Sequence, residues 1–172
     1  IGLPEAHFAR AQAALNAAEW RRGVAEADKA LDLRPDWDLA VMLKAQLQRA
    51  DSPEAAIETL RSYLAGHPQA REVRLQYARN LVGARKFSQA RTEFQRLLGD
   101  FPGNVDVIYA VAVLSVQLSD WEAAEENFKK LLGKDFAEID TVRLYLGQIA
   151  EERKQFDAAL RWYAEVAPGE QY

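Results

Sequence analysis

The side chains best suited to chemistry are scarce in this chain. It contains two histidines, His7 and His67, and no cysteine, which removes thiolate nucleophiles, disulfides and cysteine metal sites. Neither histidine has a carboxylate or another histidine at metal-ligand spacing on the same helix face. His67 directly precedes Pro68, where a solvated histidine at a helix C-terminus is the simpler interpretation. The histidines therefore favour neither a metal site nor a catalytic base.

Phosphate-binding loops and carboxylate pairs have equally little support. The nine glycines are scattered, and none form a GxGxxG or GxxxxGK[ST] loop. Carboxylates cluster at Glu122, Glu125 and Glu126 and again at Glu151 and Glu152, but such runs are typical of a solvated helix face. We therefore expect no cofactor, no metal and no intrinsic enzyme, although the sequence alone leaves paired-carboxylate hydrolysis open.

Composition and charge indicate a folded chain and argue against nucleic-acid and membrane partners. Of the 172 residues, 49% are apolar and 28% are charged, and the formal net charge is -4. Without an excess of Lys and Arg to neutralise phosphates, nucleic-acid binding is not expected. Direct membrane insertion is not expected either, because no apolar run approaches the roughly 18 to 20 residues that span a bilayer.

The chain is organised as a sequence repeat of 33 to 35 residues. A period of this length indicates an array in which each unit buries its apolar face against its neighbours. A similar block occurs five times, and its second residues are Trp20, Pro53, Phe87, Trp121 and Phe156. Three places later each block has a small residue, namely Gly23, Ala56, Ala90, Ala124 and Ala159.

Each period contains two segments with helical patterning. In the third period, Tyr77 and Leu81 share one helix face, and Phe87 and Phe94 share a face of the next helix. Residues 83–86 between them form so short a connection that the two helices must be antiparallel. Prolines 35, 68 and 102 close the first three units, and no segment shows strand-type alternation. The sequence therefore predicts an all-α fold of about five antiparallel helix pairs, with repeats at about 4–36, 37–70, 71–104, 105–139 and 140–172 in a single array over residues 1–172.

These residues resemble the tetratricopeptide repeat (TPR) family across nearly the whole chain. The resemblance rests on the aromatic that opens the second helix, on the small residue three places later and on a small residue within the first helix, as at Ala11, Ala78, Ala112 and Gly147. It implies a right-handed α-solenoid, the TPR superhelix, whose first helices line a concave groove. Lys44 at a small position, Pro53 at an aromatic position and Phe136 at a terminal proline position depart from the family pattern.

The resemblance also implies a partner-binding groove made by the first helices. Apolar anchors combine there with amides, which suits an extended peptide or a partner helix. Some TPR proteins clamp a C-terminal carboxylate, but two of the matching basic positions hold Phe8 and Glu72, so chaperone-tail docking is not expected. The predicted groove residues are Phe8, Gln12, Asn16, Val41, Ala45, Gln48, Leu75, Arg79, Val82, Tyr109, Val113, Gln117, Leu144, Gln148 and Glu151, with Glu152 beside the last.

We therefore expect a non-enzymatic scaffold or adaptor that binds a protein or peptide in the groove. One alternative is self-assembly by stacking of solenoid ends through Leu160, Trp162 and Tyr163, and another is the regulatory arm of a longer enzyme. The chain begins at Ile1, and its last unit is incomplete and has no polar capping helix, so we interpret it as a fragment of a longer protein.

A narrower resemblance concerns location. Residues 112–118, 144–154 and 169–172 resemble a group of exported proteobacterial TPR proteins, some of which are lipoproteins that act as envelope scaffolds or adaptors. The resemblance favours the bacterial periplasm or cell envelope. The cytoplasm is the alternative, because a chain without cysteine suits both compartments.

Overall fold

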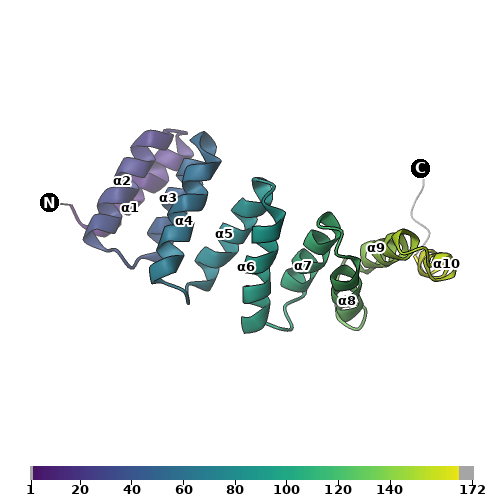
Figure 1. Ribbon diagram of the computed structural model, residues 1–172. Coiled ribbons are helices and arrows are strands. Elements are labelled where there is room, and N and C mark those ends of the chain that lie inside the picture. The colour runs from purple at the N-terminus through teal and green to yellow at the C-terminus, as the bar shows by residue number, and fades with distance from the viewer. Residues whose placement is uncertain (1, 167–172) are drawn as a thin grey trace. The chain divides into compact units, whose positions relative to one another are not determined.

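The structure is a computed structural model that describes residues 2–166. Within this part of the chain there are ten α-helices and no strand, which confirms the all-α prediction; Figure 1 gives the helix labels. None of these helices is both long and apolar enough to cross a membrane. The chain divides into two compact units, unit 1 (Ile1–Glu93) and unit 2 (Phe94–Tyr172). Each unit is described by itself.

Unit 1 is a stack of helices in which each one packs against the next. Helix α2 contacts both α1 and α3, and α4 contacts both α3 and α5. The first helices of the pairs also touch, since α3 contacts α1 on one side and α5 on the other. The helices of unit 1 are α1 (Pro4–Asn16), α2 (Trp20–Leu33), α3 (Asp38–Asp51), α4 (Pro53–Gly66), α5 (Arg71–Gly83) and the first half of α6 (Phe87–Asp100).

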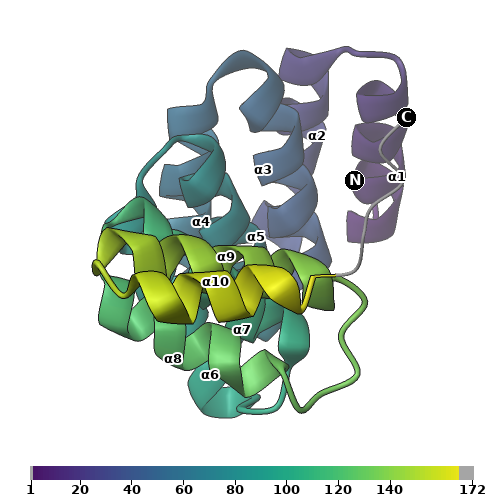
Figure 2. The same cartoon turned by 90° about the vertical axis from the view of Figure 1, so that its right-hand side faces the viewer.

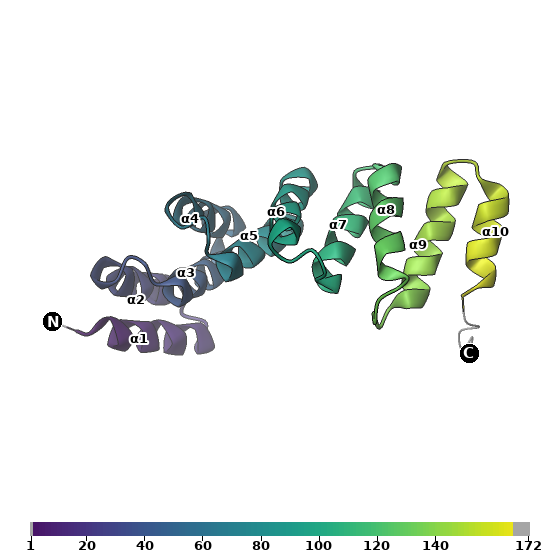
Figure 3. The same ribbon diagram turned by 90° about the horizontal axis from the view of Figure 1, so that it is seen from below.

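Unit 2 continues the same pattern. Figure 3 shows α7 beside α8 and α9 beside α10, and Figure 2 shows the short turn that joins the last pair. Its core is built around Phe128, which is fully buried and stacks on Tyr145 with ring centroids 4.7 Å apart. Besides the second half of α6, the helices of unit 2 are α7 (Val105–Gln117), α8 (Trp121–Leu131), α9 (Ile139–Glu152) and α10 (Phe156–Ala164).

The turns inside four of the helix pairs share a left-handed residue. Ala18, Arg85, Ser119 and Lys154 have φ values of 58°, 59°, 56° and 60°, and each lies two residues before the aromatic that opens the second helix. This conformation costs a residue with a side chain about 1–2 kcal/mol, so packing of the helix pair must hold it in place. In the second pair Pro53 occupies the first helical turn instead, and Ser52 Oγ accepts a hydrogen bond from the Ala55 N–H at 3.2 Å.

The small residues mark the closest approaches between helices. A Cβ atom added to Gly23 on α2 would lie 2.5 Å from Leu47 Cδ2 on α3. On Gly147 of α9 it would lie 2.3 Å from the Tyr163 ring on α10. No real Cβ contact is so short, so these helices can pack in this way only with glycine at these positions.

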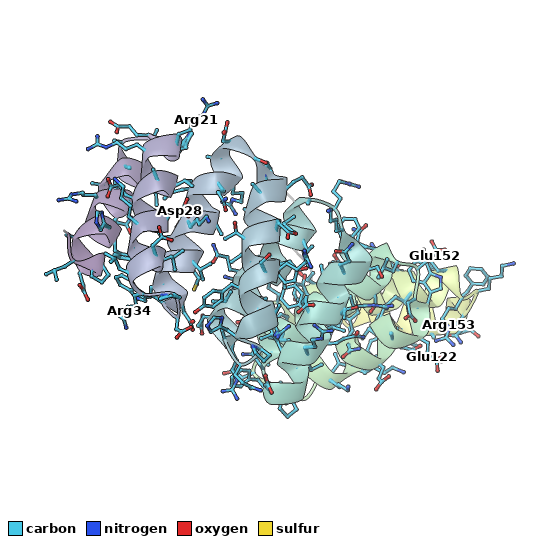
Figure 4. All side chains as sticks on the ribbon, turned by 60° about the vertical axis from the view of Figure 1, so that its left-hand side comes forward. Arg21, Asp28, Arg34, Glu122, Glu152 and Arg153 are labelled. Atoms are coloured by element: carbon cyan, nitrogen blue, oxygen red, sulfur yellow. The ribbon has the colours of Figure 1, made fainter. Side chains whose placement is uncertain are left out.

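The departures from the family pattern each have a local partner. Lys44 reaches across to α2, where its Nζ lies 2.7 Å from Oδ1 of Asp28. Figure 4 shows Asp28 between Arg21, in the first turn of α2, and Arg34, which directly follows the helix. Phe136, in the loop between α8 and α9, packs against Tyr109 with ring centroids 5.2 Å apart. The deviating residues therefore add contacts between neighbouring elements.

A buried ion pair, which the sequence analysis did not predict, links α5 to α6 within unit 1. The Nη1 atom of Arg74 donates to Oε2 of Glu93 at 2.5 Å, and both side chains are about nine-tenths buried. A second N–H of Arg74 donates to the carbonyl of Pro68 at 2.9 Å. Arg74 thus fastens the loop before α5 as well as the helix after it.

We predict that Gly147→Ala destabilises unit 2, because the new methyl group would overlap the Tyr163 ring. Overpacking of this kind costs about 1–3 kcal/mol. Thermal denaturation followed by circular dichroism measures the effect. The matched control is Gly83→Ala near the end of α5, where an added Cβ meets nothing within 4 Å, and it should leave the melting temperature unchanged or slightly raised. Equal melting temperatures for the two variants would contradict this prediction, because the overlap with Tyr163 would then cost no stability.

Candidate functional site

A cleft of about 240 Å³ lies between two first helices of unit 1. We call it the α3–α5 cleft. Both walls come from side chains three or four residues apart, which share one face of a helix. Helix α3 contributes Met42, Gln46 and Arg49, and helix α5 contributes Glu72, Leu75, Gln76, Arg79 and Asn80.

Two amide side chains in this cleft have unused hydrogen-bonding atoms. Gln76 Nε2 donates to the carbonyl oxygen of Met42 at 2.9 Å and thereby ties α5 to α3. Gln76 Oε1 and Asn80 Nδ2 are both buried and have no hydrogen-bond partner. Asn80 as a whole is only 6% exposed. A buried polar atom without a partner destabilises the folded protein by about 1–3 kcal/mol. Gln76 Oε1 and Asn80 Nδ2 are therefore both unfavourable while no ligand is bound.

The charged residues of the cleft are also unpaired. Within residues 2–166, Arg49, Arg79 and Glu72 have neither an ion-pair nor a hydrogen-bond partner for their side chains. Arg49 and Arg79 are solvent-exposed, and so is Glu72. Apolar contact surface lies between these charges, because Met42 and Leu75 are half-buried in the cleft. The α3–α5 cleft therefore combines apolar surface, unpaired amide atoms and unpaired charges of both signs.

The structure places only two of the sequence-predicted residues of unit 1 in this cleft, Leu75 and Arg79. Val41 and Ala45 on α3 are buried, at 3% and 0% exposure, and neither of them lines the cleft. Gln48 faces α4, where its Oε1 accepts a hydrogen bond from Thr59 Oγ1 at 2.7 Å. Val41 and Ala45 are buried because α3 packs against α1 on one side and against α5 on the other.

The other predicted residues of unit 1 lie outside the cleft. Phe8 is half-buried because its ring stacks on Trp37 with centroids 4.8 Å apart. Gln12 and Asn16 are exposed on α1, and Val82 is exposed near the end of α5. Sequence reasoning missed Met42, Gln46 and Arg49 as a set, although their i, i+4, i+7 spacing marks one helix face. It also missed the pairing of Gln76 with α3.

In unit 2 the predicted residues divide into packed and exposed sets. Tyr109 and Val113 pack against the core, while Gln117 is exposed at the end of α7. Leu144, Gln148 and Glu151 are all exposed and follow one face of α9. Glu152, the next residue along the chain, is exposed as well and is labelled in Figure 4. Glu151 also accepts a hydrogen bond from Tyr163, and burial together with this bond raises the pKa of the Tyr163 hydroxyl.

Both histidines serve to hold helices together. His7 Nδ1 on α1 lies 2.7 Å from Glu26 Oε2 on α2, and this hydrogen bond lowers the pKa of Glu26. His67, after α4, stacks on Tyr63 with centroids 4.0 Å apart. Its Nδ1 lies 3.0 Å from the Tyr63 carbonyl, and its Nε2 lies 2.7 Å from Oδ1 of Asp36. Both His67 nitrogens face acceptors, which favours the doubly protonated ring and raises its pKa, chiefly through Asp36.

Among residues 2–166 no three His, Asp or Glu side chains are grouped as metal ligands.

Stacked antiparallel helix pairs with a cleft between first helices define a helical-repeat protein of the interaction-scaffold class. Two family models, both described as tetratricopeptide repeat, match residues 48–114 and 109–172 and together cover well over half of the chain. The chain belongs to the tetratricopeptide repeat family, a fold typical of non-enzymatic scaffolds for protein interaction. A search of curated proteins found no match.

Several solved structures resemble the chain. MamA from Desulfovibrio magneticus RS-1, from residue 41 to its end, is 12% identical with a TM-score of 0.76, over 95% of this chain and 92% of that one. The AMB-1 form of MamA is 16% identical with a TM-score of 0.77, over 95% and 89% of the two chains. A tetratricopeptide repeat protein from Parabacteroides merdae ATCC 43184 is 17% identical with a TM-score of 0.78, over 95% of this chain and 65% of that one. At these identities the likeness shows the fold alone.

Residues 169–172, which contribute to the narrower resemblance to exported proteobacterial proteins, lie outside the described residues, as does the end of the fifth repeat.

We predict a pH-dependent contribution of His67 to stability. Its pKa is raised in the folded state, so its contribution is fully present below about pH 6.5, the unfolded value, and is lost as the pH rises through the folded value. The melting temperature of the wild type should therefore exceed that of His67→Gln by more at pH 5.5 than at pH 8.5. Asp36→Asn should weaken the same pH dependence. A difference between wild type and His67→Gln that does not change with pH would contradict the assignment.

Proposed function

We propose that the protein is a scaffold that binds an extended peptide segment of a partner protein in the α3–α5 cleft. The observation that carries this proposal is the pair of unused amide atoms, Gln76 Oε1 and Asn80 Nδ2, beside the apolar surface of Met42 and Leu75. An extended peptide presents N–H donors and C=O acceptors along its backbone, and these can pair with one amide acceptor and one amide donor.

The size of the cleft also fits a peptide better than a small molecule. At about 240 Å³ it lies below the range of about 300–1,000 Å³ that is usual for small-ligand pockets. One or two side chains of a peptide would fill it against Met42 and Leu75, while the rest of the peptide stays at the surface. Hydrogen bonds to the two amides would then offset the cost of about 1–3 kcal/mol that each unpaired atom carries without a ligand.

The exposed face of α9 in unit 2 is the second part of the proposed binding surface. Leu144 is 43% exposed there, with the amide of Gln148 and the carboxylate of Glu151 on the same face. This combination of an apolar anchor with polar neighbours suits contact with a partner protein. We propose the bacterial cell envelope as the location, following the narrower sequence resemblance.

We predict that Asn80→Leu weakens peptide binding at least about tenfold while leaving stability unchanged or improved, since it removes a buried donor that has no partner in the free protein. Ligands would come from a random peptide library panned on the wild-type protein. Their affinity would be measured by fluorescence anisotropy, and stability by thermal denaturation.

The matched control is Asn127→Leu on α8, a similarly buried asparagine at 7% exposure that lies outside the cleft. Its Nδ2 donates to the Ala123 carbonyl at 2.8 Å, and its Oδ1 is buried without a partner, as Asn80 Nδ2 is, so this variant should keep its affinity for the peptides whatever its effect on stability. Selected peptides that bind the wild type and Asn80→Leu equally well would rule out the cleft as their site.

Self-association through α10 is a second candidate function, favoured by one observation. Phe156 and Leu160 are 62% and 68% exposed. In the second repeat, the position that corresponds to Leu160 is occupied by Ile57, which is buried. Ile57 lies on α4, which is covered by the next first helix, α5. Trp162 and Tyr163, also expected in this end surface, instead pack against the core of unit 2 and against Gly147. The exposed apolar surface of α10 is therefore Phe156 and Leu160.

For this second candidate, we predict that the wild type sediments faster as its concentration rises and that Phe156→Glu with Leu160→Glu abolishes this change. Two carboxylates would place unpaired charge in an apolar contact. Analytical ultracentrifugation measures the effect. Wild-type sedimentation that is independent of concentration would exclude self-association through α10.

A further inference from the structure

The charged residues of the α3–α5 cleft indicate which peptides it takes. We propose that the cleft selects extended peptides that carry one basic and one acidic side chain three positions apart. This inference rests on the proposed peptide-binding function. It assigns the basic side chain of the peptide to Glu72 and the acidic side chain to Arg79 and Arg49.

The charged residues of the cleft have no partner, whereas several other charged residues of unit 1 are paired. Elsewhere in the unit, Arg22 pairs with Glu19 and Arg61 pairs with Glu58, each within one helical turn. Arg79 has Leu75 and Gln76 at the preceding turn, and Arg49 has Ala45 and Gln46, so neither arginine can form such a local pair. Glu72 has no basic residue at the matching positions, because Leu75 and Gln76 follow it.

The three residues separate the two signs of charge along the cleft. Glu72 and Arg79 are seven residues apart on one face of α5, which corresponds to about 10 Å along the helix axis. At this distance in water the electrostatic attraction between the Glu72 carboxylate and the Arg79 guanidinium is weak. Helices α3 and α5 run in the same direction because α4 runs back between them, so Arg49, in the last turn of α3, lies toward the Arg79 end. One end of the cleft is therefore acidic and the other is basic.

A peptide in the polyproline II conformation matches this geometry. It has three residues per turn and rises about 3.1 Å per residue, so side chains three positions apart share a face and lie about 9 Å apart. This conformation has no internal hydrogen bonds, so its backbone groups are available to pair with Gln76 Oε1 and Asn80 Nδ2. A β-strand matches less well, since its side chains on one face are about 7 or 13 Å apart.

Designed peptides test the proposal directly. Fluorescently labelled proline-rich octapeptides would carry Lys and Glu three positions apart, in both orders. The comparison peptides would carry the same charges at adjacent positions, or Gln in place of both charged residues. We expect one order at the three-residue spacing to bind about tenfold more tightly than the Gln peptide, since two exposed ion pairs contribute modestly. This preference should shrink at high ionic strength.

A charge-reversed cleft provides the decisive comparison. The triple variant Glu72→Arg, Arg79→Glu, Arg49→Glu should prefer the opposite order of Lys and Glu, because the two ends of the cleft exchange sign. The control exchanges an exposed pair outside the cleft, Glu58→Arg with Arg61→Glu on α4, and should keep the wild-type preference. Circular dichroism would verify that each variant is folded.

The possible failures can be told apart. If library-selected peptides bind and Asn80→Leu weakens them, but the charged octapeptides bind no better than the Gln peptide, the cleft binds peptides without reading their charges. In that case this inference is wrong and the proposed function stands. If neither the library nor the octapeptides yield a ligand that Asn80→Leu weakens, the proposed function fails and this inference fails with it.

Discussion

Neighbouring helices of this chain pack so closely that some positions between them accept only glycine. A single helix pair has too little apolar surface to fold by itself, so each pair must press against the next. Gly23 packs against Leu47 and Gly147 packs against Tyr163. These glycines allow the helices to approach closely, because the Cβ atom of any larger residue would overlap the neighbouring side chain. Once the pairs are stacked, the first helices of unit 1 lie next to one another, and the outer faces of α3 and α5 become the two walls of a cleft.

The same packing decides which side chains a partner can reach. Helix α3 is covered on two sides, which leaves Val41 and Ala45 inside and turns Met42, Gln46 and Arg49 outward. Polar groups that fasten the fold have their partners, as Arg74 has Glu93 and His67 has Asp36. By contrast, the cleft contains amide atoms and charges without partners. Buried polar atoms without a partner also occur outside the cleft, at Asn127 Oδ1 and Arg143 Nε, so the cleft is distinguished by combining such atoms with unpaired charges and apolar surface.

Peptide recognition and self-association would use different parts of the molecule. The α3–α5 cleft lies in unit 1, whereas Phe156 and Leu160 belong to the last helix of unit 2. A protein that binds a peptide in one unit and a second copy through the other would present several binding sites in one assembly. Such an arrangement raises the effective affinity for a partner with repeated motifs without any new contact.

The amino-acid sequence was enough to predict the class of fold and its repeat, because the signals for both are local. Helical periodicity, the aromatic and small residues of each block, and features such as Ser52-Pro53 act within one helix pair, so they can be read from neighbouring positions. It also predicted a groove along the first helices, and two of the predicted residues, Leu75 and Arg79, line the cleft. It did not determine the exposed face of α3 or the unpaired state of Asn80. Both features depend on helices about 30 residues away along the chain, because the packing of those helices decides which face of each helix is exposed to solvent. The left-handed turn residues escaped prediction for the same reason, since Ala18 and Arg85 are held in that conformation by the packed pair and not by their own preference.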